Sequence, residues 1–190
     1  MEKPKGPERL HAPWRMEYIA QAGKPVCECI FCEKPQQESD CANLIVHRGE
    51  HCFVIVNAFP YNNGHLMVIP YLHTADFTEL PPDTLQEMMR MTRLAILALQ
   101  CAMRPDGFNV GMNIGRAAGA GIAEHLHLHI VPRWNGDTNF MPVVGNTRVL
   151  PESLERTWEK VHAAFNGVLL QEGGGAGNPE CPPDEEEHQA

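Results

Sequence analysis

The chain has 190 residues, 43% of them hydrophobic, and this length and composition suit a single domain with a conventional core. The formal net charge is −9, but six acidic residues lie between Gln171 and the C-terminus, and without them the body carries only −3. A body so close to neutral argues against an extended nucleic-acid-binding surface, and the longest aliphatic run, Leu94–Leu99, is too short to cross a membrane.

The predicted organisation has three parts. Residues 1–12 are rich in Pro, Lys and Glu and are predicted to form a flexible arm, and residues 13–170 form the folded domain. Residues 171–190 combine a glycine-rich stretch with acidic residues and have almost nothing to bury, which predicts a disordered acidic tail. Met1–Gly6 lacks the apolar stretch of a signal peptide, which favours a cytoplasmic protein.

The first chemically informative element is the pair Cys29 and Cys32, whose C-x-x-C spacing lets two thiolates reach one ion. The chain has seven cysteines, and their spacing does not suggest a disulfide scaffold. In an intracellular chain a close pair is more often metal-binding or redox-active. Two alternatives stay open: Cys27 offers a second pair with Cys29, and a thioredoxin-like redox pair is conceivable without its usual βαβ context.

Three strands are predicted next. Residues 43–47 and 52–57 are apolar and β-branched and flank a short turn, which predicts a hairpin. Asn62-Asn63-Gly64 is a second turn signal, and it leads into a strand over residues 65–69.

A long helix follows the third strand. Residues 83–86 have the pattern of a capping box that opens a helix, and Pro105-Asp106-Gly107 ends it. Apolar residues follow at helical spacing and are predicted to face the core instead of a cofactor. This stripe comprises Leu85, Met89, Thr92, Ile96, Leu99 and Met103.

Residues 108–113 and 125–131 predict two more strands, joined by a loop rich in Gly and Ala, and a last helix follows Pro151. The pattern is therefore α+β, with about five strands and two helices. Short connections between the strands imply an antiparallel sheet. The long helix would cover one face of this sheet, and the other face would carry the histidines of residues 125–131.

The run from His125 to Pro132 alternates three histidines with apolar residues. Successive side chains of a strand point to opposite faces, so the imidazoles of His125, His127 and His129 are predicted to share one face. Such a row offers a nucleophile, proton donors and metal ligands within a few ångströms of each other. The alternative is an ordinary half-buried strand with its histidines on the solvated side.

Several segments together resemble the signatures of the histidine triad family of nucleotide-binding hydrolases and transferases. They are the histidine run, Cys29–Cys32 and residues 57–70, 109–115 and 118–121, and the resemblance covers the chain from about Trp14 to Phe165. Residues 12–19 and 132–141 are similar to the bacterial branch that contains diadenosine tetraphosphate phosphorylases. The resemblance implies the histidine triad fold, in which two subunits often join edge to edge as a homodimer.

The resemblance also implies a mechanism. His127 would be the nucleophile that attacks the α-phosphorus of a nucleotide and forms a nucleotidyl-histidine intermediate. The backbone carbonyl of His125 would accept from Nδ1 of His127 and fix its tautomer, and His129 would stabilise charge on the phosphate. A closed, structural zinc site would be made by Cys29, Cys32, His73 and His125.

The resemblance implies nucleotide-binding roles for Asn57, His65, Asn113, Gly119, Ala120 and Gly121. Asn57 would bind the ribose, His65 would lie near the phosphates, and the glycine-rich loop would offer backbone N–H groups to them. Many relatives have Gln or Ser where Ala120 or Gly121 stands, so this chain lacks a side-chain donor there. Arg116 either compensates or is a solvated loop charge.

Four of the candidate residues have structural alternatives. Asn57 and Asn113 are also common turn residues. Trp134 and Asp137 either shape the second half of a dinucleotide site or stabilise a turn.

These inferences predict an enzyme that cleaves a dinucleoside polyphosphate, such as diadenosine tetraphosphate, by phosphorolysis or hydrolysis, with structural zinc as its cofactor. Its partners would be a purine nucleotide or dinucleoside polyphosphate and a second copy of the chain, without nucleic acid or membrane. The alternatives are an adenylate phosphoramidase or nucleotidyl transferase, and a non-catalytic nucleotide-binding sensor.

Overall fold

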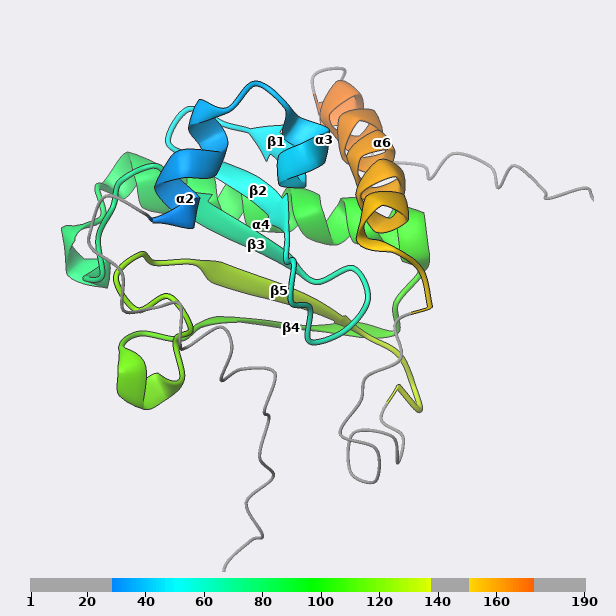
Figure 1. The fold of residues 1–190 in the computed structure, drawn as a ribbon. Coiled ribbons are helices and arrows are strands. Elements are labelled where there is room, and N and C mark those ends of the chain that lie inside the picture. The colour runs from blue at the N-terminus through cyan, green and yellow to red at the C-terminus, as the bar shows by residue number, and fades with distance from the viewer. Residues whose placement is uncertain (1–28, 138–150, 173–190) are drawn as a thin grey trace, which may run out of the picture.

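The computed structural model describes residues 29–137 and 151–172. Within them, five strands form one antiparallel sheet in the order β1-β2-β3-β5-β4, which confirms the predicted α+β class (Figure 1). The strands are β1 (Ile45–Arg48), β2 (Cys52–Val56), β3 (Leu66–Pro70), β4 (Gly107–Met112) and β5 (Leu128–Arg133). The helices are α2 (Ile30–Glu33), α3 (Asp40–Asn43), α4 (Pro82–Met103) and α6 (Leu154–Glu172), with 3-10 turns at Lys34–Gln36, Phe77–Glu79 and Arg116–Ala118.

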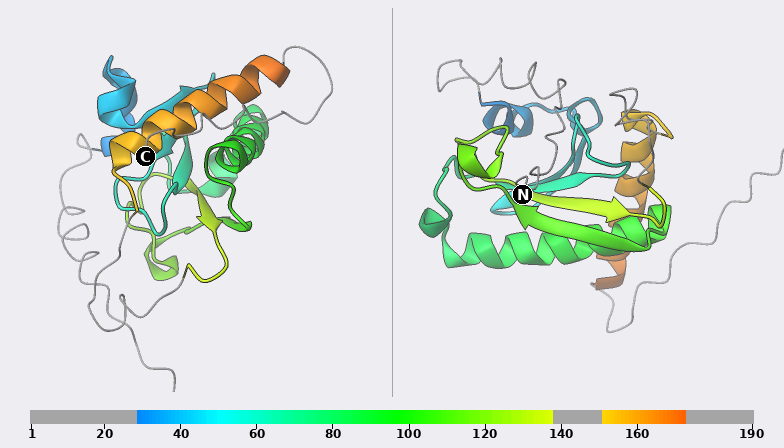
Figure 2. Two further views of the ribbon diagram at one scale, coloured as in Figure 1. Left: turned by 90° about the vertical axis from the view of Figure 1, so that its right-hand side faces the viewer. Right: turned by 90° about the horizontal axis from the view of Figure 1, so that it is seen from below.

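The two long helices pack against each other and cover different parts of the sheet. Helix α4 runs along one face and packs on β2 and β3, while α6 packs on α4 and on β1 (Figure 2). The single-turn helix α2 lies on the opposite side from α4. The central strands β2 and β3 are buried along their whole length, because both of their faces are covered.

The predicted hairpin is closed by a side chain from the long helix. The carboxylate of Glu87 in α4 accepts the backbone N–H groups of Glu50 and His51 in the turn between β1 and β2, and of Cys52 at the start of β2. Gly49 leaves room for this contact, since a Cβ there would lie 2.6 Å from the carboxylate. The carboxylate therefore ties α4 to the β1–β2 turn.

Two predictions about α4 are wrong. The capping box does not open the helix, because Pro81 is the N-cap residue and Pro82 occupies the first turn, where its missing N–H costs nothing. Met89 in the predicted core stripe is 61% exposed, whereas Met88 and Met91 are buried. The buried stripe of α4 is therefore rotated around the helix axis relative to the predicted stripe. Apolar residues lie on both faces of the helix, so the sequence alone did not show which of them face the core.

The two edges of the sheet differ. At β1, Trp158 Nε1 donates to the carbonyl of Ile45 at 2.8 Å, and His162 Nδ1 donates to the carbonyl of Val46 at 2.9 Å. These α6 side chains cover carbonyl groups that a neighbouring strand would otherwise use. At the opposite edge, residues 109–111 of β4 are exposed.

Helix α6 continues to Glu172, two residues beyond the predicted domain boundary at residue 170. The Glu172 carboxylate pairs with Arg90 at 2.9 Å and with Arg93, both in α4. The predicted arm at residues 1–12, the tail from 173 onward and the family-like tracts 12–19 and 138–141 lie outside the described residues. Among the helices that are described, none has the length and apolar character needed to span a bilayer.

Candidate active site and metal centre

The histidine run straddles the start of β5. The ladder between β3 and β5 ends at the pair Val68 and Leu128, so His125 and His127 precede the strand and the prediction of a strand beginning at residue 125 is wrong. The neighbouring segment, residues 70–74, holds this part of the run instead. His125 Nε2 donates to the carbonyl of Pro70 at 2.8 Å, and the Leu126 N–H donates to the carbonyl of Thr74 at 2.9 Å.

All three histidines of the run are buried, as is His65, which immediately precedes β3. Their exposed fractions are 0% for His125, 6% for His127 and 8% for His129. The alternative of an ordinary strand with its histidines on the solvated side is therefore wrong. Buried imidazoles need hydrogen-bond partners, and these partners define the site.

The tautomer of His127 is fixed by the backbone. Its Nδ1 lies 2.8 Å from the carbonyl oxygen of His125, and because a carbonyl only accepts, Nδ1 carries the proton. Burial lowers the pKa of His127, although the hydrogen bond to the His125 carbonyl opposes this shift. At neutral pH the ring is therefore uncharged, with its lone pair on Nε2, as a nucleophile requires.

A second chain of hydrogen bonds fixes His129. The Tyr61 N–H donates to Nδ1 of His65 at 3.0 Å, so the proton of neutral His65 is on Nε2. That Nε2 lies 2.9 Å from Nδ1 of His129 and donates to it, which leaves the proton of neutral His129 on Nε2. The structure thus brings His65 behind His129, and the ring of His129 meets that of His127 edge-on at 4.7 Å between centroids.

Phe31 connects His127 to the cysteine motif. This buried residue lies between the two cysteines in α2, and its ring centroid is 5.6 Å from that of His125 and 5.3 Å from that of His127. The contact of Phe31 with both histidines means that the position of α2 affects the histidine row.

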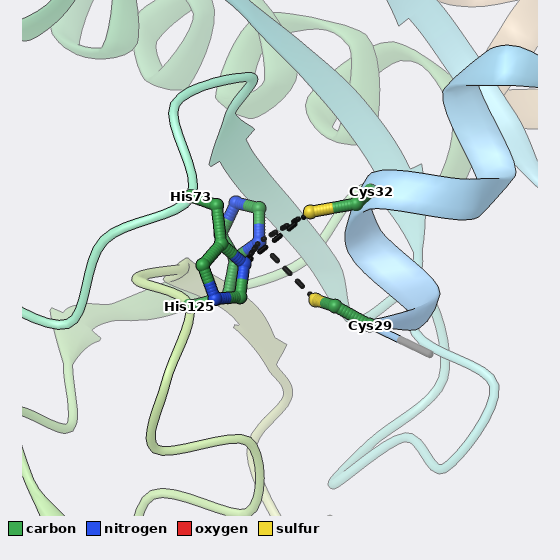
Figure 3. A group of neighbouring side chains, drawn as sticks. All are labelled: Cys29, Cys32, His73 and His125. Atoms are coloured by element: carbon green, nitrogen blue, oxygen red, sulfur yellow. Dashed lines mark hydrogen bonds between the residues drawn. The ribbon is translucent and has the colours of Figure 1, made fainter. Parts of the chain in front are cut away.

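Four side chains converge beside this row: Cys29 at the N-cap of α2, Cys32 within α2, His73 from the loop after β3, and His125 (Figure 3). Their ligand atoms all lie within 4.8 Å of one another. Sulfur-to-nitrogen distances are 3.3 Å for Cys29–His125, 3.3 Å for Cys32–His73 and 3.6 Å for Cys32–His125. The two Nδ1 atoms are 3.2 Å apart.

This geometry fits a tetrahedral zinc ion. Zn–S bonds of about 2.3 Å and Zn–N bonds of about 2.0 Å place sulfur about 3.6 Å from nitrogen and the nitrogens about 3.3 Å apart. His125 Nε2 donates to Pro70, so its Nδ1 presents a lone pair to the cluster. Two cysteine thiols and two imidazoles that converge on one point are the donor set of a closed Cys₂His₂ zinc site, which favours metal over a redox pair at Cys29 and Cys32. Cys27 lies outside the described residues.

Protonation in the metal-free cluster follows from burial. Burial lowers the pKa of His125 to about 4, so its ring is neutral at pH 7. Burial and the neighbouring Cys29 raise the pKa of Cys32 to about 11, which keeps this thiol protonated without metal. Binding of a divalent cation would therefore displace protons from the thiols, and its affinity would rise with pH.

The loop after β4 carries the candidate phosphate-binding residues. Its Gly119 N–H donates to the carbonyl of Arg116 at 3.0 Å, and its Ala120 N–H donates to that of Gly115 at 3.4 Å. Positive φ angles of 78° at Gly115 and 87° at Gly119 allow this tight turn. The two amides that were expected to face phosphate are thus used inside the loop.

Other predicted residues have local structural partners. Asn57 Oδ1 accepts the Phe59 N–H at 2.9 Å, while its Nδ2 is 3.3 Å from Nδ1 of His65. Asp137 accepts from Arg133, from the Trp134 N–H and from Asn62, so it stabilises a turn. Asn113 and Gly121 are half-buried in the loop, and Arg116 is exposed and 3.8 Å from Glu124.

Comparison with known proteins agrees with this site. The family model for the HIT domain matches residues 38–136, just over half of the chain. AP-4-A phosphorylase of Mycobacterium tuberculosis is 42% identical over 159 residues, covering 79% of this chain and 80% of that enzyme. Adenylylsulfatase HINT3 of Arabidopsis thaliana is 36% identical, covering 58% of this chain and 54% of its own length.

A solved structure shows the same fold. The Zn-bound histidine triad family protein of Mycobacterium smegmatis matches with a TM-score of 0.61 and 28% identity, covering 77% of this chain and 98% of that protein. The match to the HIT domain model and the 42% identity to a phosphorylase over most of both chains agree with the buried histidine row. The chain therefore belongs to the histidine triad family of nucleotide hydrolases and transferases.

Proposed function

We propose that this enzyme cleaves dinucleoside polyphosphates, with diadenosine tetraphosphate as the first substrate to test, through a nucleotidyl intermediate on His127. The observation that carries this proposal is the backbone hydrogen bond that leaves the lone pair of His127 on Nε2. The choice of substrate is supported by the 42% identity to AP-4-A phosphorylase.

The reaction has two displacements at one phosphorus. In the first, His127 Nε2 forms a bond to the α-phosphorus of the substrate, and the bond from that phosphorus to the bridging oxygen breaks, releasing a nucleoside polyphosphate. In the second, an oxygen of water or inorganic phosphate forms a bond to the same phosphorus and the P–N bond breaks, restoring His127. The Nε2–H of His129 would donate to a phosphate oxygen on which charge accumulates.

For the nucleotide we propose contacts with Asn57, His65, Asn113 and residues 119–121. Asn57 already accepts the Phe59 N–H, and His65 acts through His129, so its role is to orient that ring. The amides of Gly119 and Ala120 are bonded within the loop, and binding of phosphate there requires these bonds to be exchanged. We therefore propose that this loop changes shape when substrate binds.

We propose that Cys29, Cys32, His73 and His125 hold a structural zinc ion. Four protein ligands would close the coordination shell, so the ion would hold α2, the loop after β3 and the histidine row together. Zinc thiolates are kept reduced in the cytoplasm, where we place the enzyme. Metal analysis of the purified protein tests this, with about one zinc ion per chain expected and none in Cys32→Ser.

We propose a homodimer that forms through β4, because α6 side chains cover the carbonyl groups at the β1 edge. Val110 in the middle of β4 is 45% exposed, and among the described strands β4 has a neighbour, β5, on one side only. Sedimentation of the wild type and of Val110→Lys tests this arrangement. A dimer that Val110→Lys leaves unchanged would contradict the use of β4.

The function itself is tested by incubating the protein with diadenosine tetraphosphate, with and without inorganic phosphate, beside His127→Ala. ADP and ATP formed only with phosphate would show phosphorolysis, and AMP and ATP formed regardless of phosphate would show hydrolysis. Turnover that persists in His127→Ala would contradict the proposed nucleophile.

Small adenylates are the second candidate substrates, favoured by the identity to an adenylylsulfatase over 58% of this chain. Faster turnover of an adenylate than of diadenosine tetraphosphate would establish them. Binding of nucleotide without any turnover would support a sensor.

A further inference from the structure

We infer that Thr74 is a positioning residue for the nucleophile, acting through the peptide group between His125 and Leu126. The inference rests on the proposed function, because it takes His127 as the reacting group. Among the described residues, the side chain of Thr74 hydrogen-bonds Asp76 and Glu79, and not His127 or the four residues of the metal cluster. Nothing in its sequence context marks it as functional.

One peptide group connects the two hydrogen bonds involved. Its carbonyl, from His125, accepts Nδ1–H of His127 at 2.8 Å, and its N–H, from Leu126, donates to the carbonyl of Thr74 at 2.9 Å. A trans peptide group is planar, with its C=O and N–H pointing in opposite directions. Thr74 therefore sets the direction of the carbonyl that selects the tautomer of His127, and its hydrogen bond also polarises that carbonyl.

Hydrogen bonds of the β-sheet do not orient this peptide group. The β3–β5 ladder ends at Leu128, two residues after the peptide group concerned. The other contacts from residues 70–74 reach the ring of His125, through the Pro70 carbonyl and the Nδ1 of His73. They orient that imidazole toward the cluster, whereas the Thr74 carbonyl directly orients the peptide group.

The side chain of Thr74 explains how its carbonyl is held. Thr74 is 6% exposed in a loop whose neighbouring residues are exposed. Its hydroxyl donates to the carboxylate of Glu79 at 2.5 Å and accepts the Asp76 N–H at 3.1 Å. The carbonyl of Asp76 in turn accepts the Glu79 N–H at 3.2 Å. The hydroxyl thus closes the loop over residues 74–79 and fixes the backbone from which the carbonyl projects.

The test compares Thr74→Val, which removes the hydroxyl at nearly constant volume, with Thr74→Ser, which keeps it. Thr78→Val is the matched control, since the Thr78 hydroxyl belongs to the same loop but bonds only the carboxylate of Asp76 among the described partners. Each variant is purified with its metal, and zinc content is measured first. The readouts are kcat and KM, hydrogen exchange of the Leu126 amide, and the 15N shifts of the His127 ring at fixed pH.

We expect Thr74→Val to lower kcat by about 10- to 100-fold with little change in KM, because misplacement of a reacting group affects the chemical step. Leu126 exchange should accelerate, and the ring should shift from the pure Nδ1–H tautomer toward a mixture. Thr74→Ser and Thr78→Val should keep wild-type values. If Thr74→Val does not fold with metal bound, Glu79→Ala, at an exposed acceptor, replaces it with the same expectations.

Unchanged Leu126 exchange and an unchanged His127 tautomer in the variant would overturn the inference. So would an equal fall in kcat for Thr78→Val, which would show a general effect of the loop. A wild type without turnover would overturn the proposed function instead, while exchange and ring shifts would still decide the role of Thr74.

Discussion

The two ends of the histidine row are held by different means. His129 lies inside β5 and pairs with Met67 across the sheet, and its ring is held by His65, whose own orientation is set by a backbone amide. His125 lies beyond the ladder and is held by a loop carbonyl and by its contacts with Cys29, Cys32 and His73. The comparison shows that loop contacts and this side-chain cluster take over where the sheet ends. His127, the proposed nucleophile, lies between the two.

The largest effect on activity is expected for His127, in the middle of the histidine row. His127→Ala removes the group proposed to form the covalent bond, so kcat should fall by at least about 10⁴-fold. Metal content should stay close to that of the wild type, because the ring is not in the cluster. Steady-state kinetics and metal analysis check this. Loss of metal in this variant would show that His127 and the metal cluster are not independent of each other.

Breaking the His125 end should reduce stability as well as activity. For a metal present at 1,000 times its dissociation constant, removal costs about 4 kcal/mol of unfolding free energy, or a fall in Tm of about 10 °C for a chain of this size. Cys32→Ser should show this fall in a calorimetric scan, together with reduced kcat. Cys41→Ser, at an exposed cysteine outside the cluster, is the control and should change neither.

Breaking the His129 end should reduce activity with metal retained. His65→Ala removes the donor to Nδ1 of His129, and we expect kcat to fall by about 10²-fold, as for loss of a group that supports proton transfer. Zinc content should remain at the wild-type value. Loss of zinc in this variant would mean that the two ends are not independent.

The smallest effect on activity is expected away from both ends, at Glu87. Burial opposes its ionisation, but the N–H groups of Glu50, His51 and Cys52 outweigh this and lower its pKa. The stabilisation is therefore complete above the ordinary glutamate pKa and is lost as the pH falls through the lower pKa of the folded state.

Glu87→Gln should lower the free energy of unfolding by about 2 kcal/mol at neutral pH, with kcat unchanged. Urea unfolding at several pH values measures this, and the gap between wild type and variant should close in acid. A gap that persists at low pH would contradict a role for the carboxylate charge. A large fall in kcat would show that general destabilisation, and not the local contacts, accounts for the other variants.

The sequence predicted the sheet and the long helices because their apolar periodicities are strong. It placed the start of β5 three residues too early, since alternation continues through His125 and His127 although their backbone partners come from a loop. It misplaced the buried face of α4 because methionines lie on both faces. These errors arise where tertiary contacts outweigh local pattern.

For the site, alternation and C-x-x-C spacing indicated the histidines and cysteines, while their association with His73 came from the family resemblance. The backbone donors and acceptors at Tyr61, Pro70 and Thr74 were missed, because any residue type carries an amide and a carbonyl. An Asn-Gly turn or a row of histidines can be recognised in the sequence. A backbone carbonyl that selects a tautomer cannot, because every residue has one.

The covered edge of the sheet limits how these molecules can assemble. Strand pairing between two copies that each present β4 would be self-complementary and would consume both open edges at once. Were the carbonyls of Ile45 and Val46 also available, each new subunit would present a fresh edge and the sheet would extend into a fibre. In such an assembly, Trp158 and His162 would stop strand pairing at two subunits.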